Sequence, residues 1–294
     1  MRPVFGGIAI FRNLLGLAHG EAHGQVSLID LDERRVVSRI LVQAEGDAFT
    51  DAGGVAFDAS CSVYVADTRN DVVRRYTAFG REVARYGQRV ERGPGTVERD
   101  RLGVLDRPRA VAVHGGVLWV ASGERKLVRG VQRFDLASGT PLGFVRSFGE
   151  VDRRFGAPRG LAIDASGVLV ADTLHGVIQR FTLDGRYVGS VPLAVDADDA
   201  PRPVAVLRLD DGDLLVADAG DRGGLVRVSL AGVRRALPPW PPGTFVEPTA
   251  LARDAAGRIY VLDRHGERVQ RLGPDLSYDG VVVDLFELLG RFPE

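Results

Sequence analysis

Short runs of alternating apolar and polar residues, each bounded by turn residues, recur along the whole chain. The clearest copy covers residues 158–187, where four such runs are separated by turns that include Asp164-Ala-Ser-Gly167 and Leu183-Asp-Gly185. Alternation over five or six residues predicts half-buried β-strands. No stretch of 10 to 15 residues shows the helical period. The pattern therefore predicts an all-β protein built from short strands joined by tight turns.

The predicted second strand of each unit ends in the same way, which reveals an internal repeat. Val-Ala-Asp or Val-Leu-Asp closes this strand at Asp67, Asp172, Asp218 and Asp263, while His19 and Ser122 hold the same place in two further copies. A period of about 45 residues with four strands per unit is typical of β-propellers. We therefore predict an all-β, six-bladed β-propeller with four antiparallel strands per blade. It fills residues 1–294 as a single domain, with blades at about 3–43, 50–88, 107–150, 156–193, 201–238 and 246–285 and a C-terminal clasp at 286–294.

Small residues begin most of the predicted first strands, which line the axis of a propeller. They are Gly7, Gly54, Ala110, Gly160 and Ala250. Six strands that converge on one axis need small side chains to approach closely. Because the chain starts with a first strand and ends with a fourth, we expect every blade to be contiguous, without a strand borrowed from the other terminus.

The motif in residues 158–185 resembles a known family. Pro158-x-Gly160, then Val170-Ala-Asp172, Val177-Ile-Gln-Arg-Phe181 and Asp184-Gly185 are similar to the NHL repeat, and the resemblance covers about residues 3–285. It implies a six-bladed propeller. Proteins of this kind serve as protein-binding platforms, RNA-binding surfaces and, in a few branches, lyases or hydrolases, so the resemblance leaves the function open.

Composition narrows the choice of partners. The formal net charge is −1, so bulk electrostatics give no attraction to DNA, RNA or membranes. Cys61 is the only cysteine, so no disulfide framework exists. The apolar start of the chain is interrupted by Arg12 and Asn13, which favours a strand over a signal peptide. These features predict a cytoplasmic protein with no membrane and no DNA partner.

The sequence contains few of the residue patterns that are typical of catalytic or metal-binding sites. A carboxylate at a strand end caps a turn by accepting backbone N–H bonds, so we interpret the recurring aspartates, with His19 and Ser122, as structural. The histidines are scattered, and the predicted inner strands offer few metal ligands besides Glu247, which precedes one of them. We therefore predict no metal, no cofactor and no catalytic residues. A hydrolase or lyase similar to lactonases or amidating lyases, with or without a metal ion, is the alternative.

Arginines mark one face as a candidate binding surface. Arg109, Arg159 and Arg202 precede or begin inner strands and should ring the mouth of the axis in three consecutive blades. The loops between second and third strands add Arg69, Arg125, Arg222 and Arg264. The opposite face should collect aspartates and be acidic: Asp58, Asp164, Asp184, Asp210, Asp211, Asp213, Asp254 and Asp275. The guanidinium group of arginine can bind carboxylate or phosphate partners through two hydrogen bonds. A GC-rich genome, which favours arginine codons, would also explain why the chain uses arginine in place of lysine.

The same face should carry three long insertions, at 88–106, 193–200 and 237–245. The last is Pro-rich and holds Trp240, expected to be exposed or tucked over the mouth. We predict a non-enzymatic interaction module in which Trp240 anchors a protein partner at the centre, an acidic segment or another subunit. Arg109, Arg159, Arg202, Arg69, Arg222 and Arg264 would surround it. RNA binding through the same face is a weaker alternative, because the acidic 193–200 loop would repel phosphate.

Overall fold

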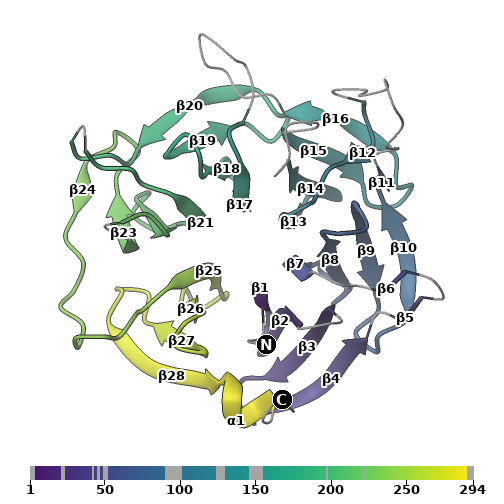
Figure 1. Ribbon diagram of the computed structural model, residues 1–294, viewed down its shortest axis with the longest axis horizontal. Helices are drawn as coiled ribbons and strands as arrows, with labels where there is room; N and C mark the ends of the chain where they lie inside the picture. The colour runs from purple at the N-terminus through teal and green to yellow at the C-terminus, as the bar shows by residue number, and fades with distance from the viewer. Residues whose placement is uncertain are drawn as a thin grey trace.

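Six four-stranded antiparallel sheets stand around a central axis and form a ring (Figure 1). The computed structural model describes residues 4–20, 24–41, 43–44, 47–48, 52–89, 101–123, 130–145, 155–196, 198–221 and 223–289. Each sheet uses strands that are consecutive in the sequence, so no blade exchanges a strand between the two termini. The predicted six-bladed all-β propeller and its contiguous blades are therefore confirmed.

The strands of the six blades follow one another in chain order. Blades 1 to 3 are β1 (Val4–Phe11), β2 (Leu14–Gly20), β3 (Gly24–Asp30) and β4 (Arg35–Leu41); β7 (Ala52–Phe57), β8 (Val63–Asp67), β9 (Val72–Tyr76) and β10 (Glu82–Tyr86); and β13 (Ala110–His114), β14 (Val117–Ser122), β15 (Gly130–Asp135) and β16 (Pro141–Val145). Blades 4 to 6 are β17 (Pro158–Asp164), β18 (Gly167–Asp172), β19 (Val177–Phe181) and β20 (Tyr187–Pro192); β21 (Pro203–Arg208), β22 (Leu214–Asp218), β23 (Gly224–Val228) and β24 (Arg234–Arg235); and β25 (Pro248–Arg253), β26 (Ile259–Asp263), β27 (Arg268–Leu272) and β28 (Tyr278–Asp284).

Two short strand pairs and one helix complete the described structure. β5 (Gln43–Ala44) pairs antiparallel with β6 (Asp47–Ala48), β11 (Gln88–Arg89) pairs parallel with β12 (Val104–Leu105), and α1 (Leu285–Leu289) follows the last strand. No helix among the described residues is long and apolar enough to cross a membrane.

Burial along the strands explains the sequence pattern. Every residue of β8, β18, β22 and β26 is buried, because neighbouring blades cover both faces of these second strands. The fourth strands lie at the rim and alternate; in β20, for instance, partly buried and exposed residues take turns. The second strands are therefore buried along their whole length, whereas every second residue of a rim strand such as β20 is exposed.

Apolar clusters fill the spaces between adjacent blades. Each of six clusters joins residues of two neighbouring blades, and together they run around the ring. Leu15 and Ile29 of blade 1 share a cluster with Tyr260 and Val283 of blade 6. Figure 1 shows β1 beside β25, so the first and last blades meet directly. Side-chain packing, and not a shared strand, closes the ring.

Glycine at the axis is required by close approach of the inner strands. A Cβ atom on Gly54 would lie 3.0 Å from the Cα atom of Ala110, and one on Gly160 would lie 2.7 Å from the carbonyl oxygen of Val204. Both neighbours are backbone atoms, which cannot move aside cheaply. The small residues predicted for the inner strands are thus confirmed as a steric requirement.

The C-terminal segment turns back at the seam between the last and first blades. The backbone N–H of Leu285 donates to the carbonyl oxygen of Glu267 at 2.9 Å, and its buried side chain joins the cluster that connects blades 6 and 1. Phe286, the first residue of the predicted clasp, is 48% exposed. The last five residues of that clasp, 290–294, lie outside the described residues.

Candidate ligand-binding site at the mouth of the axis

The strand-end aspartates hold the chain where it enters a blade. In blade 4, buried Asp172 accepts hydrogen bonds from the backbone N–H groups of Gly156 and Ala157, both at 2.9 Å, and from the side-chain amide of Gln179 at 2.7 Å. In blade 5, Asp218 accepts the backbone N–H of Arg202 at 2.6 Å. These donors lie about 16 residues before the aspartate, immediately ahead of the inner strand. The carboxylate therefore fixes the approach to the axis.

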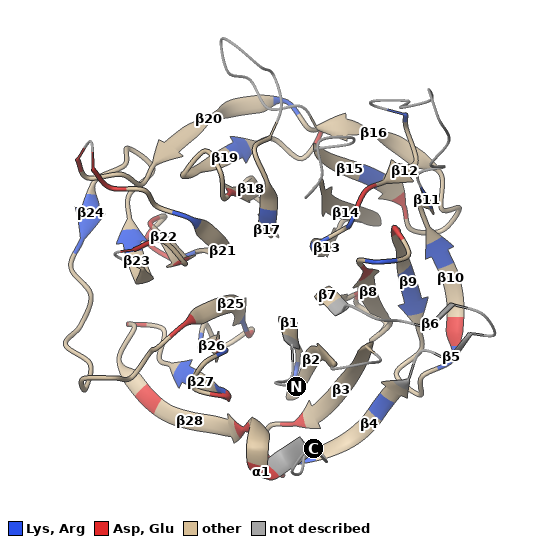
Figure 2. Cartoon of the chain, viewed as in Figure 1, with Lys and Arg blue, Asp and Glu red and all other residues tan. Residues whose placement is uncertain are grey.

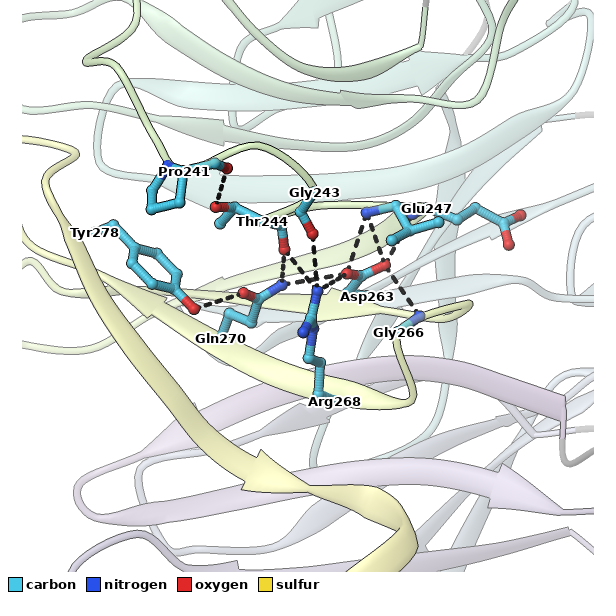
Figure 3. Close-up of polar contacts among 10 residues, drawn as sticks. Pro241, Gly243, Thr244, Glu247, Asp263, Gly266, Arg268, Gln270 and Tyr278 are labelled. Carbon is cyan, nitrogen blue, oxygen red and sulfur yellow. Dashed lines mark hydrogen bonds and ion pairs between the residues drawn. The ribbon is translucent and has the colours of Figure 1, made fainter.

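Blade 6 shows the same arrangement in full (Figure 3). Asp263 accepts the N–H groups of Val246 at 3.1 Å and Glu247 at 2.8 Å, and the amide of Gln270 at 3.2 Å. In Figure 3 the Glu247 side chain points away from this network while its backbone is held by it. The predicted structural role of the aspartates is confirmed, with one correction. Besides the turn that follows, Asp172, Asp218 and Asp263 bind the incoming loop.

A depression of about 420 Å³ opens at the axis on the face where these loops lie. Four arginines line it, one from each of blades 3 to 6: Arg109, Arg159, Arg202 and Arg264. Figure 2 shows basic positions at the axial ends of β13, β17 and β21. Three of these arginines lie next to or within the start of an inner strand, and Arg264 follows β26. We call this depression the mouth cavity.

The wall of the mouth cavity is asymmetric. Blades 1 and 2 contribute Phe5, Gly6 and Gly53, which carry no charge, opposite the arginine side. Among the described lining residues, Glu247 is the one acidic side chain, so the formal excess is three positive charges. Positive charge concentrated in a concave site draws anions toward it. The cavity thus has a basic wall and an uncharged wall.

Glu247 forms a polar cluster with Arg264 and His265 at the edge of the cavity. Its carboxylate accepts hydrogen bonds from the guanidinium of Arg264, with Nε at 3.0 Å, and from the ring Nδ1 of His265. Partial burial works to raise the pKa of Glu247, but the hydrogen bonds from Arg264 and His265 outweigh it and hold the pKa below its usual value. Arg264 therefore already binds a carboxylate, and the other arginines of the basic wall can bind the same kind of group.

The other predicted basic residues take different positions. Arg69 is exposed on the loop after β8 and is not one of the residues that line the mouth cavity. Arg222 and Arg125 lie outside the described residues. In the described ranges, no group of three or more His, Cys, Asp or Glu side chains is arranged to hold a metal ion.

Trp240 does not lie at the centre, so its predicted position was wrong. Its indole N–H donates to the carbonyl oxygen of Leu276 at 2.9 Å, and its ring meets Phe245 edge-on at 5.1 Å. Leu276 belongs to the turn between β27 and β28, on the face opposite the mouth. Figure 1 shows the segment after the short β24 running along the outside of the ring toward β25. Trp240 packs there, between blades 5 and 6.

Several of the aspartates predicted for the opposite face pair with arginines. Arg208 donates to Asp164 at 2.9 Å, and Arg227 donates to Asp213 at 2.9 Å. Three further aspartates of this face pair with arginines: Asp58 with Arg75, Asp210 with Arg253 and Asp254 with Arg258. These arginines offset part of the negative charge of the opposite face, which the sequence prediction did not include.

Known structures share the fold at low sequence identity. A streptogramin B lyase matches with a TM-score of 0.65 and 14% identity over 94% of this chain and 82% of its own. Virginiamycin B lyase from Staphylococcus aureus matches with a TM-score of 0.62 and 14% identity over 91% and 80%. A protein of unknown function from Bacteroides caccae gives 0.61 and 15% over 87% and 89%. At these identities the similarity shows the six-bladed propeller fold alone.

No family model matches the chain, and no curated protein matches it. The NHL repeat suggested by the sequence motifs is therefore not established as the family of this protein.

Proposed function

We propose that this protein is a non-enzymatic binding module whose mouth cavity receives a carboxylate-bearing segment of a partner protein. One observation supports the proposal most strongly. Four arginine residues from four consecutive blades line a single cavity of about 420 Å³. Guanidinium and carboxylate pair through two parallel, charge-assisted hydrogen bonds. We also propose that the repeats are of the NHL type and that the protein works in the cytoplasm.

The Glu247–Arg264 contact supports carboxylate as the ligand group. This contact joins both carboxylate oxygens to one guanidinium at the rim of the cavity. Arg202, at the same rim, is exposed and has the same chemistry. A partner carboxylate would form with Arg109, Arg159 or Arg202 the kind of pair that Glu247 forms with Arg264 within the chain.

The test is capture of partners from a lysate of the organism that makes the protein. Wild type is compared with the triple variant Arg109→Glu/Arg159→Glu/Arg202→Glu. The matched control is Arg39→Glu/Arg81→Glu/Arg186→Glu, which reverses the same number of charges at exposed positions that do not line the cavity. Thermal melts confirm that all three proteins are folded, and mass spectrometry identifies what is captured.

A protein retained by wild type and by the control but lost from the mouth variant is the expected result. Identical capture by all three proteins would contradict the proposal. Loss of the captured material after nuclease treatment, with a steep decrease of binding as salt rises, would favour RNA instead.

Lyase or hydrolase chemistry at the same mouth is a second candidate, favoured by one specific contact. The His265 ring is hydrogen-bonded to the Glu247 carboxylate beside the cavity. Imidazole and carboxylate side chains are the usual groups for general acid–base catalysis. Among the structures of similar fold, a histidine-to-alanine variant of virginiamycin B lyase is described as catalytically inactive and was solved with quinupristin.

Turnover of quinupristin, followed by mass spectrometry of the reaction mixture, tests this second candidate. Glu247→Gln and His265→Ala should abolish any activity. His175→Ala is the matched control, because His175 lies on the corresponding loop of blade 4, beside Asp172, and does not line the cavity. Consumption that is absent in wild type, or that all three variants retain, excludes this role for the His265–Glu247 pair.

A further inference from the structure

A narrow shaft continues the mouth cavity along the axis. Its volume is about 80 Å³, and its wall consists largely of small and aliphatic residues of the inner strands, including Gly7, Gly54, Ala110, Gly160, Ala205 and Ala250. Arg109, Arg159, Val204 and Thr249 line both the mouth cavity and the shaft. The two spaces therefore adjoin. The mouth cavity is the larger and carries more of the charged residues, and the shaft combines small aliphatic side chains with polar groups of Arg109, Arg159 and Thr249.

The shaft cannot widen to accept a large group. Its collar is made of backbone atoms in close contact, as at Gly54 against Ala110 and at Gly160 against Val204. Close-packed backbone transmits strain and does not yield to an inserted side chain. A ligand can therefore place no more than one small group in the shaft.

This geometry favours the end of a chain over its middle. The inner strands surround the opening on all sides, so a segment that passed through the cavity would have to enter and leave by the same mouth. A chain end needs room for only one peptide segment in the mouth. Of the two ends, the C-terminus carries negative charge, and the cavity wall has an excess of positive charge.

We propose that the mouth cavity recognises the C-terminal residue of the partner segment. The terminal carboxylate binds Arg109 and Arg159, the arginines that line both spaces, and the small aliphatic side chain of the last residue enters the shaft. An acidic side chain one or two residues earlier binds Arg202, at the outer level of the cavity. This inference rests on the proposed function and specifies which part of the partner is recognised.

Four labelled hexapeptides test the proposal by fluorescence anisotropy at low salt. The first, Gly-Ser-Gly-Glu-Glu-Val, has a free C-terminal carboxylate, and the second is the same peptide as its C-terminal amide. The third ends in Trp in place of Val, and the fourth has Gln in place of both Glu residues. A charge-assisted hydrogen bond contributes enough that the free acid should bind at least about tenfold more tightly than the amide. The Trp peptide should lose a similar factor, because the shaft cannot hold its side chain.

Two variants assign the contacts within the cavity. Arg109→Gln/Arg159→Gln should abolish the difference between free acid and amide. Arg202→Gln should weaken both of these peptides while keeping the ratio between them, and it should have little effect on the Gln peptide. Thermal melts establish that the variants are folded before their binding is compared.

The outcomes separate this inference from the proposed function. Equal affinities of the free acid and the amide overturn recognition of the C-terminus, yet they leave the acidic-segment proposal standing if the mouth variant of the capture experiment still loses its partner. Failure of all four peptides to bind at concentrations up to about 1 mM also overturns recognition of the C-terminus, because that affinity is weaker than two charge-assisted contacts should give. The capture experiment decides the proposed function independently of either result.

Discussion

His19 occupies in blade 1 the position that an aspartate holds in four other blades. The side chain is buried, and its ring Nε2 lies 2.8 Å from the hydroxyl of Ser27. Burial, and to a lesser extent the charge of Arg39, lowers the pKa of His19 to about 4. A neutral imidazole can form hydrogen bonds here without placing a charge in the interior. The buried position therefore favours the unprotonated ring.

Protonation of His19 should make the fold less stable in mild acid. The unfolded chain takes up the proton near pH 6.5 and the folded chain near pH 4, so the free energy of unfolding falls as the pH drops between these values. The contribution of His19 amounts to about 3 kcal/mol, from a shift of about two and a half pKa units. Urea unfolding at pH 7 and pH 4.5 measures it. His19→Gln, which does not titrate, should lose less stability than wild type over this interval, and an equal loss in both would contradict the assignment.

Thr249 presents the opposite case, a polar group without a partner. In the described part of the chain its hydroxyl is buried and makes no hydrogen bond. Such a group costs about 1–3 kcal/mol, so Thr249→Val, which keeps the shape, should raise the free energy of unfolding by about 1 kcal/mol. Urea unfolding of both proteins at pH 7 checks this. A less stable valine variant would show that the hydroxyl is satisfied in solution.

Among the elements, the short rim strand of blade 5 is the exception to the regular pattern. β24 has two residues, and the Pro-rich segment that follows takes the space beside blade 6. The carbonyl oxygen of Thr244 accepts hydrogen bonds from Gln270 and Arg268, so this loop is joined to the third strand of the next blade (Figure 3). Trp240 is therefore part of the interface between two blades.

Replacing Trp240 should affect stability and leave binding unchanged. Trp240→Ala removes the contacts with Phe245 and the hydrogen bond to Leu276, and should lower the free energy of unfolding by about 2–4 kcal/mol. Denaturant unfolding measures the loss, and capture of the partner at a temperature where the variant is folded provides the control. If the folded variant no longer captured the partner, Trp240 would be a binding residue after all.

The sequence predicted the elements better than it predicted the directions of loops. Val-Ala-Asp endings follow from rules that act within one blade, and the inner glycines follow from a contact between inner strands that repeats around the ring, so strands and axis could be predicted. The position of Trp240 depends on how far β24 extends, which composition does not encode. The pairing of Asp164 with Arg208 depends on contact between two blades. Arg109, Arg159 and Arg202 could be placed near the axis because each adjoins an inner strand, whereas the Glu247–Arg264–His265 cluster joins residues separated by a whole hairpin.

At the scale of the whole molecule, closure of the ring depends on one apolar seam. Blades 1 and 6 share no strand, so the cluster that includes Leu15, Tyr260, Val283 and Leu285 holds the two ends of the chain together. Loss of this seam would expose apolar faces on both terminal blades. The stability of the whole ring therefore depends on this seam.

Leu285→Ala should weaken the seam by about 2–5 kcal/mol, the usual cost of removing a buried leucine side chain. Phe286→Ala is the matched control, because the neighbouring phenylalanine is 48% exposed and should change stability little. Denaturant unfolding gives the two free energies. Hydrogen exchange should show faster exchange in β1 and β28 of the Leu285 variant, and uniform protection around the ring would contradict a special role for this seam.

In blades 4 to 6, hydrogen bonds to the aspartates fix the residues beside the mouth independently of the connections that lead to them. The amides of Ala157, Arg202 and Glu247 are bound by a carboxylate of their own blade, so the adjoining cavity residues keep their positions whatever the length of the preceding loop. Insertions can therefore accumulate upstream of these amides, or be exchanged between blades, without rearranging the charges at the axis. The outer connections are free to diversify, and the arginine cavity can be inherited unchanged.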